Sequence, residues 1–319
     1  MAMKLLMKAR VVATQRETAR VKSFVLAHAT RPELPAFEAG AHTTVVLPSG
    51  LKRQYSLCSD PADRRTWRIA VLRQDEGFGG SRAMHDLRDG DTLFISYPAN
   101  HFPLADDAAF HLLIAGGIGI TPLVAMAYAL KARGARFRLH YCADSVAELA
   151  LHDELRAAFG HDNVQFHPSH GIEAAPLDLA ALLRHRPKGA HVYVCGPRRM
   201  IDAVVAMSEK AGWLKSAVHF EQFSSGSLES ARHGEPFEIE IASSGAVLPV
   251  PGDKSALEIL RSHGFSIDSA CEAGLCGTCR VGYSAGEPIH RDMALGVAER
   301  TTAILTCVSR ARGRIVLTL

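Results

Sequence analysis

The sequence predicts a multidomain protein in which an antiparallel β-barrel precedes a Rossmann-like α/β domain and a small C-terminal β domain. Three observations support this fold class. Short apolar stretches separated by turn residues come first, strands alternating with helices follow, and strand patterns flank a group of cysteines near the end. With 319 residues, the chain is expected to form two or three domains, each with its own core.

The first domain is expected to span residues 1–105 as an antiparallel sheet or barrel. Its strands are short apolar runs bounded by turn residues, which is typical of such sheets. They are predicted at 10–13, 23–27, 43–47, 67–72 and 92–96, and a short helix is predicted at 82–87.

The second domain, residues 106–224, is expected to contain a parallel sheet with helices. An apolar run leads into a glycine turn and then into a helix with Pro122 near its first position, where proline is favoured. Strands alternating with helices indicate a parallel sheet. Strands are predicted at 110–115, 137–141 and 191–195, and further helices at 146–159 and 198–211.

Residues 225–234 form a polar, glycine- and serine-rich stretch that we interpret as a linker. The third domain, residues 235–319, begins and ends with alternating apolar residues, at 237–241 and 315–319, with a short helix at 257–263 between them. A small sheet with one helix is therefore predicted there.

Composition excludes several classes of protein. The net charge of +3 is too small to indicate binding to nucleic acid or to a membrane. The apolar window 112–130 contains three glycines and Pro122, so a strand, a turn and a helix are expected there rather than a membrane span.

No signal peptide is expected, and the three cysteines outside the C-terminal group, Cys58, Cys142 and Cys195, show no disulfide pattern. A reducing cytoplasm is therefore predicted.

Four cysteines near the C-terminus are the strongest chemical signal in the chain. Cys271, Cys276, Cys279 and Cys307 follow the pattern C-x4-C-x2-C with a distant fourth member, which is the spacing of a plant-type [2Fe–2S] centre. Gly274 and neighbouring small residues permit a loop that curls around a cluster. A zinc site with four thiolates is the alternative, but such sites usually pair two C-x2-C knuckles, and only one is present here.

The turn that follows the predicted strand 110–115 has the composition of a phosphate-binding turn. Glycines at this place let backbone amides approach a pyrophosphate at the N-terminus of a helix, although proline stands where G-x-G-x-x-G has its last glycine. A tight turn without a ligand is the alternative. The residues are Gly116, Gly117, Gly119, Thr121 and Pro122.

Two further positions lie at the carboxyl ends of predicted strands of the same domain. Asp144 would accept a hydrogen bond from an adenosine ribose and repel a 2′-phosphate, which favours NADH over NADPH, although an aspartate at a strand end is also common on surfaces. Cys195, Gly196 and Pro197 end another strand, at the edge where ligands bind in open α/β sheets; a buried cysteine before a turn is the alternative.

In the first domain, two short motifs indicate a site for a phosphate and a flat ring. Alternation along a strand places Arg53 and Tyr55 on one face, followed by Ser56 and Leu57. Downstream, Gly79, Gly80 and Ser81 precede the predicted helix and offer amides and a hydroxyl. Each motif alone is weak evidence, because such residues usually only pack.

Other catalytic arrangements are not indicated. The sixteen histidines show no spacing typical of metal ligands, and no serine–histidine–aspartate or paired-carboxylate motif is recognisable.

Taken together, the motifs RQYSL, GGS, GGIGITP, CGP, HFEQF and CEAGLCGTC stand in an order that resembles the phthalate dioxygenase reductase family, over essentially the whole chain. The resemblance implies a flavin-binding barrel, an NAD-binding domain and a C-terminal plant-type ferredoxin with a β-grasp fold. Such proteins pass hydride from NADH to FMN and single electrons through the cluster to a Rieske-type terminal oxygenase.

The resemblance also implies roles for individual residues. Arg53 and Ser81 would hold the FMN phosphate with the amides of Gly79 and Gly80, Tyr55 would pack on the flavin, and Ser56 would reach its N5 region. Gly117, Gly119 and Thr121 would line the pyrophosphate path of NADH, Cys195 would lie beside the nicotinamide, and Phe223 would cover the isoalloxazine. The chain departs from its relatives at Phe78, where they commonly have arginine.

Electron counting supports the same chain of cofactors. NADH releases two electrons together as hydride, whereas a [2Fe–2S] cluster accepts one at a time, so a flavin is needed between them. The sequence therefore predicts an NADH-dependent oxidoreductase that contains FMN and supplies an oxygenase. A di-iron monooxygenase or a separate ferredoxin remains an alternative acceptor, and a zinc-binding module without redox activity is a remote alternative.

Overall fold

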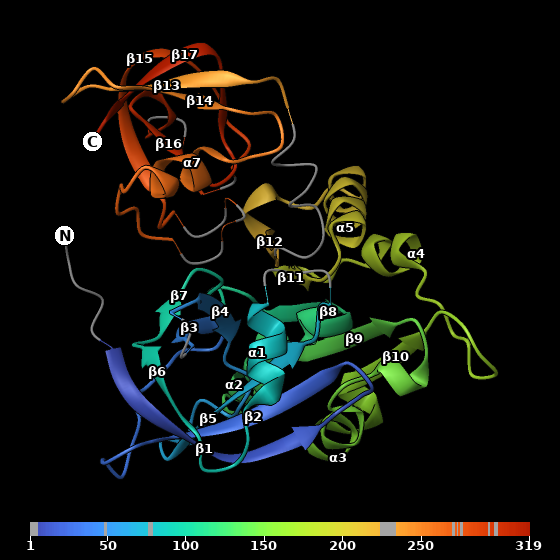
Figure 1. Cartoon of the computed structure of the whole chain (residues 1–319). Coiled ribbons are helices and arrows are strands. Elements are labelled where there is room, and N and C mark those ends of the chain that lie inside the picture. The colour runs from blue at the N-terminus through green and yellow to red at the C-terminus, as the bar shows by residue number, and fades with distance from the viewer. Residues whose placement is uncertain are drawn as a thin grey trace. The chain divides into compact units, whose positions relative to one another are not determined.

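The computed structural model describes residues 6–47, 50–75, 79–223, 234–269, 272, 274, 277–292, 294–296 and 299–319. The chain divides into two compact units, Met1–Phe223 and Ser224–Leu319 (Figure 1). The described residues confirm the predicted fold class: an antiparallel barrel, a parallel α/β sheet, and a small β domain with one helix.

The N-terminal half of the first unit is an antiparallel barrel. Its strands follow the order β4-β3-β6-β1-β2-β5, and β7 pairs with β3. Alternation explains the strands, since β1 buries Met7, Ala9 and Val11 on one face and exposes the residues between them. The elements are β1 (Leu6–Arg16), β2 (Val21–His28), β3 (Ala41–Val46), β4 (Lys52–Ser56), β5 (Thr66–Leu72), α1 (Gly80–Asp86), β6 (Thr92–Ser96) and β7 (Ala99–Asn100).

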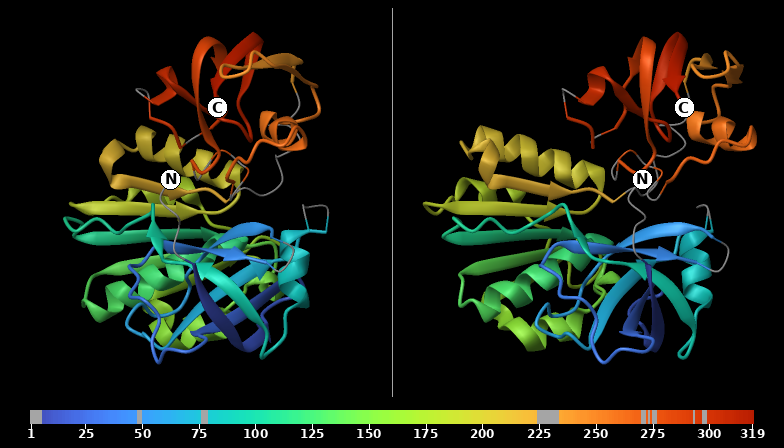
Figure 2. Two further views of the ribbon diagram at one scale, coloured as in Figure 1. Left: turned by 60° about the vertical axis from the view of Figure 1, so that its left-hand side comes forward. Right: turned by 90° about the vertical axis from the view of Figure 1, so that its left-hand side faces the viewer.

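The C-terminal half of the first unit is a parallel sheet of order β10-β9-β8-β11-β12. Its helices cover both faces: α2 and α3 contribute to the core on one side, and α4 and α5 to the core on the other (Figures 1 and 2). The elements are β8 (Phe110–Gly116), α2 (Ile120–Ala132), β9 (Phe137–Ala143), α3 (His152–Asn163), β10 (Val164–Pro168), α4 (Leu179–Arg184), β11 (Ala190–Cys195), α5 (Arg198–Lys210) and β12 (Val218–Glu221).

Several predicted boundaries were wrong. The helix predicted at 146–159 is a 3-10 turn at Val146–Glu148 followed by α3, because Leu151 adopts a left-handed φ of 62° that interrupts the helical path. The helix predicted at 82–87 begins at Gly80, so that Ser81 lies in its first turn rather than before it. The short elements β7, β10, α4 and β12 were missed, because runs of two to six residues carry little periodicity.

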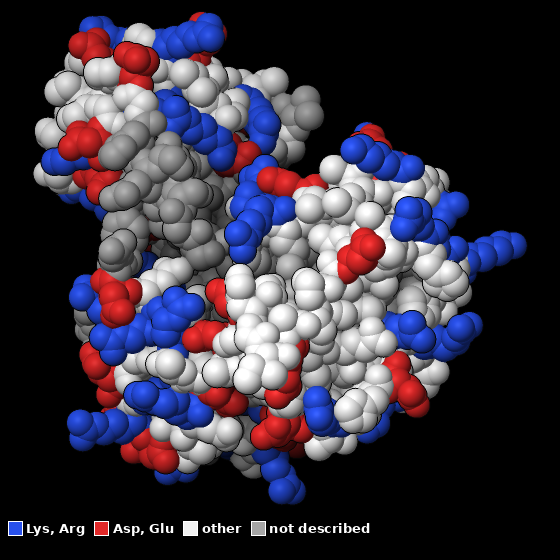
Figure 3. All heavy atoms as spheres, turned by 90° about the vertical axis from the view of Figure 1, so that its right-hand side faces the viewer, with Lys and Arg blue, Asp and Glu red and all other residues white. Residues whose placement is uncertain are grey.

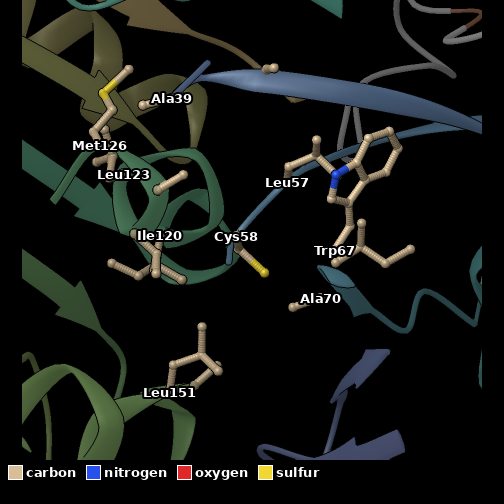
Figure 4. Packing of buried hydrophobic residues seen from close by; sticks show 14 of the residues in the cluster. Ala39, Leu57, Cys58, Trp67, Ala70, Ile120, Leu123, Met126 and Leu151 are labelled. Carbon is tan, nitrogen blue, oxygen red and sulfur yellow. The ribbon is translucent and has the colours of Figure 1, made fainter. Parts of the chain in front are cut away.

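The barrel and the parallel sheet share one continuous hydrophobic core. Figure 4 shows Leu57 and Trp67 of the barrel and Ile120 and Leu123 of α2, which belong to one hydrophobic cluster, and all four side chains are fully buried. Burial of such apolar surface stabilises the contact by about 25 cal/mol for each Å² removed from water. The two halves of the first unit are therefore expected to behave as one body.

A nearly buried ion pair joins the same two halves. Both terminal nitrogens of Arg68, on β5, donate to the carboxylate of Glu154, on α3, at 2.5 and 2.6 Å. The carboxylate also accepts from the Tyr128 hydroxyl of α2 at 2.9 Å, and Arg68 donates to the carbonyl oxygen of Cys58 at 2.8 Å. Two parallel bonds fix the orientation of both partners, which a single contact would not do.

The second unit is a five-stranded mixed sheet of order β14-β13-β17-β15-β16, in which β13 and β17 run parallel. Helix α7 begins with a capping box in which Ser255 and Glu258 satisfy each other's backbone amides. The buried guanidinium of Arg310 donates to the carbonyl oxygens of Glu235, Pro251 and Lys254. The elements are β13 (Phe237–Ile241), β14 (Val247–Val250), α7 (Ala256–Ser262), β15 (Arg280–Ile289), β16 (Ala303–Leu305) and β17 (Arg310–Thr318).

The surface charges and the helices are consistent with the absence of a predicted membrane or nucleic-acid binding region. On the face in Figure 3, lysine and arginine are interspersed with aspartate and glutamate. Within the described ranges, no helix combines the length and the apolar character needed to cross a membrane. The apolar window 112–130 forms β8, a 3-10 turn and most of α2, as predicted.

Glu154→Ala is expected to destabilise the first unit by about 2 kcal/mol, because it leaves the guanidinium of Arg68 mostly buried and without its forked partner. Urea denaturation followed by tryptophan fluorescence measures the change. Arg73→Ala is the matched control: it breaks an exposed ion pair with Asp75 and is expected to cost less than about 0.5 kcal/mol. Equal losses in the two variants would contradict the structural role of the pair.

Candidate functional site

Strand β4 presents two of the predicted flavin residues on one face. Arg53 pairs with Val45 of β3 and Tyr55 with Thr43, so alternation puts both side chains on the same side. Burial raises the pKa of the Tyr55 phenol, while the nearby charge of Arg53 acts in the opposite direction. Tyr55 is therefore a neutral, partly buried ring beside a cation.

The predicted phosphate residues lie together at the start of α1. A side chain at Gly80 would place its Cβ 2.9 Å from both Cγ and Nε of Arg53, so only glycine lets that arginine cross the start of the helix. The preceding Gly79 adopts a left-handed φ of 79°. The Ser81 hydroxyl accepts from the Gln74 amide at 3.0 Å, which holds it in place. Phe78, the departure from the family pattern, lies outside the described residues.

The two glycine motifs of the parallel sheet contact each other through their backbones. A Cβ at Gly119 would lie 2.2 Å from the carbonyl oxygen of Cys195, and one at Gly116 would lie 2.7 Å from the Pro197 ring. The Cα of Gly116 would be 3.0 Å from a Cβ at Gly196. The glycines therefore allow the turn between β8 and α2 to pack against the end of β11 and the turn that follows it, where a side chain would not fit.

Two other predicted nucleotide residues occupy the same edge of the sheet. The buried Thr121 hydroxyl donates to the Ile118 carbonyl oxygen at 3.1 Å and so closes the turn that precedes α2, in which Pro122 is the third residue. Asp144 directly follows β9, its side chain is exposed, and its carbonyl oxygen accepts from the His170 amide at 2.9 Å. The structure thus places Asp144 where the sequence predicted it, past a strand end.

The carboxylate of Glu221 was not predicted from the sequence. It lies between Ser56, a predicted flavin residue, and Cys195, a predicted nicotinamide residue. The Ser56 hydroxyl of the barrel donates to Oε2 of Glu221 on β12 at 3.4 Å. Glu221 is the register partner of Cys195, whose pKa is raised well above its ordinary value by complete burial and further by the Glu221 charge. Ser56, Cys195 and Glu221 therefore meet where the barrel joins the parallel sheet.

Burial raises the pKa of Glu221 to about 7, although the hydrogen bond from Ser56 opposes the shift. A carboxyl group in this state exchanges its proton near neutral pH. The motif HFEQF contains both Glu221 and Phe223, but a functional role was predicted only for Phe223. Phe223 is half-buried and packs against the shared core, two residues beyond Glu221. Since β12 is only four residues long, its pattern did not reveal which face Glu221 occupies.

In the second unit, the structure describes two of the four predicted cluster ligands. Cys279 and Cys307 are both buried and share an apolar cluster with Leu257 and Leu305. The residue before Cys307, Thr306, donates to the carbonyl oxygen of Cys279 through its amide at 3.2 Å and its hydroxyl at 3.0 Å. This contact brings the segments of the two thiols together. Cys271 and Cys276 lie outside the described residues.

Comparison with known proteins finds similarity over both units of the chain. A family profile described as a 2Fe-2S iron-sulfur cluster binding domain matches residues 239–312, and one described as the N-terminal domain of dimethylamine monooxygenase subunit DmmA-like proteins matches residues 97–218. The solved structure of phthalate dioxygenase reductase, described as modular for electron transfer from pyridine nucleotides to [2Fe-2S], superposes with a TM-score of 0.80, at 37% identity over 98% of both chains.

The chain belongs to the phthalate dioxygenase reductase family.

Two curated relatives extend the comparison. The reductase subunit of a tert-butanol monooxygenase / tert-amyl alcohol desaturase from Aquincola tertiaricarbonis is 44% identical over 88% of this chain and 86% of its own length. The beta subunit of a heme-dependent oxidative N-demethylase from Ectopseudomonas mendocina is 40% identical over 99% of both chains. This member of the phthalate dioxygenase reductase family is therefore an oxidoreductase that transfers electrons through a flavin and a [2Fe–2S] centre, as the reductase component of an oxygenase system.

Glu221→Gln is expected to change how stability depends on pH. A carboxyl group whose pKa is raised on folding stabilises the folded state least above that pKa, so the stability of the natural protein falls as pH rises from about 4.5 to about 7. Glutamine removes this penalty, which is on the order of 3 kcal/mol. Urea denaturation of flavin-free protein at pH 5 and pH 8 should show the variant gaining stability over the natural protein only at pH 8.

The control for this prediction is Glu209→Gln, because Glu209 lies exposed near the end of α5. Its stability difference from the natural protein is expected to be the same at both pH values. A Glu221→Gln variant that behaves in the same way would contradict the raised pKa.

Gly119→Ala is expected to lower stability and activity because the added methyl group has no room, and not because of the backbone conformation. The φ of −62° at Gly119 suits any residue, but the added methyl would lie 2.2 Å from the Cys195 carbonyl oxygen and would push the turn before α2 away from the end of β11. Overpacking of this kind costs about 1–3 kcal/mol. We expect a lower thermal midpoint and a fall of about tenfold or more in kcat/KM for the reduced pyridine nucleotide. Flavin content serves as the internal control and should not change.

Proposed function

We propose that this chain is the NADH-dependent, FMN-containing reductase component of a two-component Rieske-type oxygenase or demethylase. The observation that carries the proposal is the hydrogen bond between Ser56 and Glu221, which joins the predicted flavin site of the barrel to the predicted nicotinamide site of the parallel sheet. Hydride transfer requires donor and acceptor atoms to be about 3–3.5 Å apart, so the two sites must meet.

The choice of FMN is supported by the close packing of the Arg53 side chain against Gly80 at the start of α1. A guanidinium, the amides at the start of α1 and the Ser81 hydroxyl suit a terminal phosphate, and the Tyr55 ring on the same strand face suits a flat ring system. No segment of the sequence resembles an element that holds the adenosine half of FAD. FMN is therefore the flavin that we propose.

NADH is supported by the two close-packed glycine turns and by Asp144. The amides of the turn at Gly117–Gly119 precede α2, where a pyrophosphate is favoured. The exposed Asp144 carboxylate would bond to a ribose hydroxyl and repel the 2′-phosphate of NADPH. We therefore propose NADH as the donor.

When bound, FMN supplies the chemistry that the side chains lack, because it takes two electrons as hydride and releases them one at a time to the [2Fe–2S] centre. The protein's own task is placement. Ser56 would bond near the flavin N5, Cys195 would lie beside the nicotinamide, and Phe223 would cover the flavin ring until the nicotinamide takes its place. The cluster ligands that we propose are Cys271, Cys276, Cys279 and Cys307.

The proposed partner is a Rieske-type terminal oxygenase, and the proposed location is the cytoplasm, where thiols stay reduced. One relative favours a second candidate acceptor, because its name assigns it to a heme-dependent oxidative N-demethylase. Reduction assays with a purified Rieske oxygenase and a purified heme-dependent demethylase distinguish the two acceptors.

Cys276→Ser tests the proposed electron path. The variant is expected to keep NADH oxidation by ferricyanide, which takes electrons from the flavin, within about twofold of the natural protein, and to lose cytochrome c reduction through the cluster, because serine is a poor ligand for the cluster iron. Absorption spectra before and after anaerobic NADH provide the independent readout: the natural protein should show flavin bands and cluster shoulders that bleach together. Cys142→Ser, which changes a cysteine outside the C-terminal group, is the matched control. Survival of both activities in Cys276→Ser would contradict the cluster assignment.

A further inference from the structure

The residue that follows Cys271 has an unusual backbone conformation. Glu272 adopts a left-handed φ of 52°, and among the described non-glycine residues it shares a positive φ only with Leu151. This conformation is unfavourable for a residue that carries a Cβ, whereas glycine adopts it freely. Since the chain has glutamate there, its side chain is expected to contribute something that glycine would not.

The Glu272 carboxylate is held from two sides. Its Oε1 accepts from NH1 of Arg261 at 3.1 Å and from the Ser269 hydroxyl at 2.8 Å. NH2 of Arg261 in turn donates to the Ser269 hydroxyl at 2.7 Å and to the Ile267 carbonyl oxygen at 2.7 Å. One guanidinium therefore bonds to three points of the segment that surrounds Cys271 in the sequence, whereas a typical surface ion pair makes one contact.

Helix α7, which carries Arg261 in its last turn, is also bonded to the backbone beside Cys307, one of the two predicted ligands that the structure describes. The Leu257 amide, in its first turn, donates to the carbonyl oxygen of Thr306 at 2.9 Å. Thr306 precedes Cys307 and bonds to the carbonyl oxygen of Cys279. The helix thus links the backbone around Cys279 and Cys307 to the Arg261–Glu272 contact.

A second left-handed residue follows closely. Gly274 has a φ of 75°, and a Cβ there would lie 2.7 Å from Cγ2 of Val308 and 3.0 Å from Cα of Asp292. Gly274 therefore packs against the segment just after Cys307. Both described residues of this stretch are therefore left-handed: Glu272 is held by side-chain bonds, and Gly274 by close packing.

We propose that Glu272 is a positioning residue of the [2Fe–2S] site: Arg261 and Ser269 anchor its carboxylate, which holds the backbone next to Cys271 in the left-handed conformation needed by the ligand loop. This inference rests on the proposed assignment of the four cysteines as cluster ligands. The Arg261–Glu272 pair also places one positive and one negative charge beside the loop, so each member is expected to act on the cluster's potential with its own sign.

The test uses full-length protein with a reconstituted cluster, in the variants Glu272→Gln, Glu272→Gly, Arg261→Gln and Arg261→Lys. The readouts are the half-life of the cluster absorbance in excess iron chelator and the midpoint potential followed by electron paramagnetic resonance. All four variants are expected to shorten the half-life by about tenfold, because each breaks the anchoring network.

The potentials separate positioning from general damage. Glu272→Gln should raise the potential, because it removes a negative charge and leaves Arg261 uncompensated beside the more negative reduced cluster. Arg261→Gln should lower it for the opposite reason. Arg261→Lys keeps the positive charge but cannot make the several bonds of the guanidinium, so it should shorten the half-life of the cluster with little change in its potential. Arg312→Gln, which breaks an exposed pair with Glu287 in the same unit, is the matched control and should match the natural protein.

Three results would overturn the inference. Half-lives within twofold of the natural protein in Glu272→Gln and Arg261→Gln would remove any role for the pair. A Glu272→Gly variant as stable as the natural protein would mean that the position needs only a left-handed backbone. Potentials that shift in the same direction in Glu272→Gln and Arg261→Gln would indicate nonspecific damage. A natural protein without any cluster signal would instead contradict the proposed function itself, and the inference with it.

Discussion

The first unit depends on the attachment of its barrel to its parallel sheet. The residues proposed for flavin and for nicotinamide come from different sheets, so on this proposal neither half alone can bring a donor close to an acceptor. A shared core, with Leu57 and Trp67 packed against Ile120 and Leu123, makes the two halves one body. The forked pair of Arg68 and Glu154 then fixes their relative orientation, which apolar contacts alone do not, since the hydrophobic effect has no direction.

Arg68 also bonds to the segment that follows β4, the strand of the proposed flavin residues. Its second nitrogen bonds to the carbonyl oxygen of Cys58, two residues beyond Ser56, and Ser56 itself bonds to Glu221 across the junction. The same junction therefore contains both the contact that orients the halves and a buried carboxyl group whose pKa is about 7. If hydride is transferred at this junction, as we propose, a change that alters the stability of the first unit is also expected to alter the surroundings of the reacting atoms.

Close backbone packing recurs in both units. In the parallel sheet, Gly119 lets the turn before α2 pack against the end of β11, where no side chain would fit. In the second unit, Gly274 packs on Val308 in the same way, and Glu272 takes a left-handed conformation that its carboxylate bonds sustain. In each case a loop with a proposed ligand-binding role has close contacts at a glycine, which is why a single added methyl group there is expected to have a large effect.

The sequence by itself determined the fold class and the kinds of chemistry, because cysteine spacing, glycine turns and the periods of apolar residues are local properties of the chain. It identified Arg53, Gly80 and Ser81 as neighbours in function, and the structure brings them together around α1. Tertiary structure alone decided the role of Glu221, since its pKa and its contact with Ser56 depend on burial between segments 165 positions apart. It likewise decided that Glu154 anchors Arg68 and that Leu151 interrupts the predicted helix, because long-range contacts and a single left-handed residue leave no periodic pattern in the sequence.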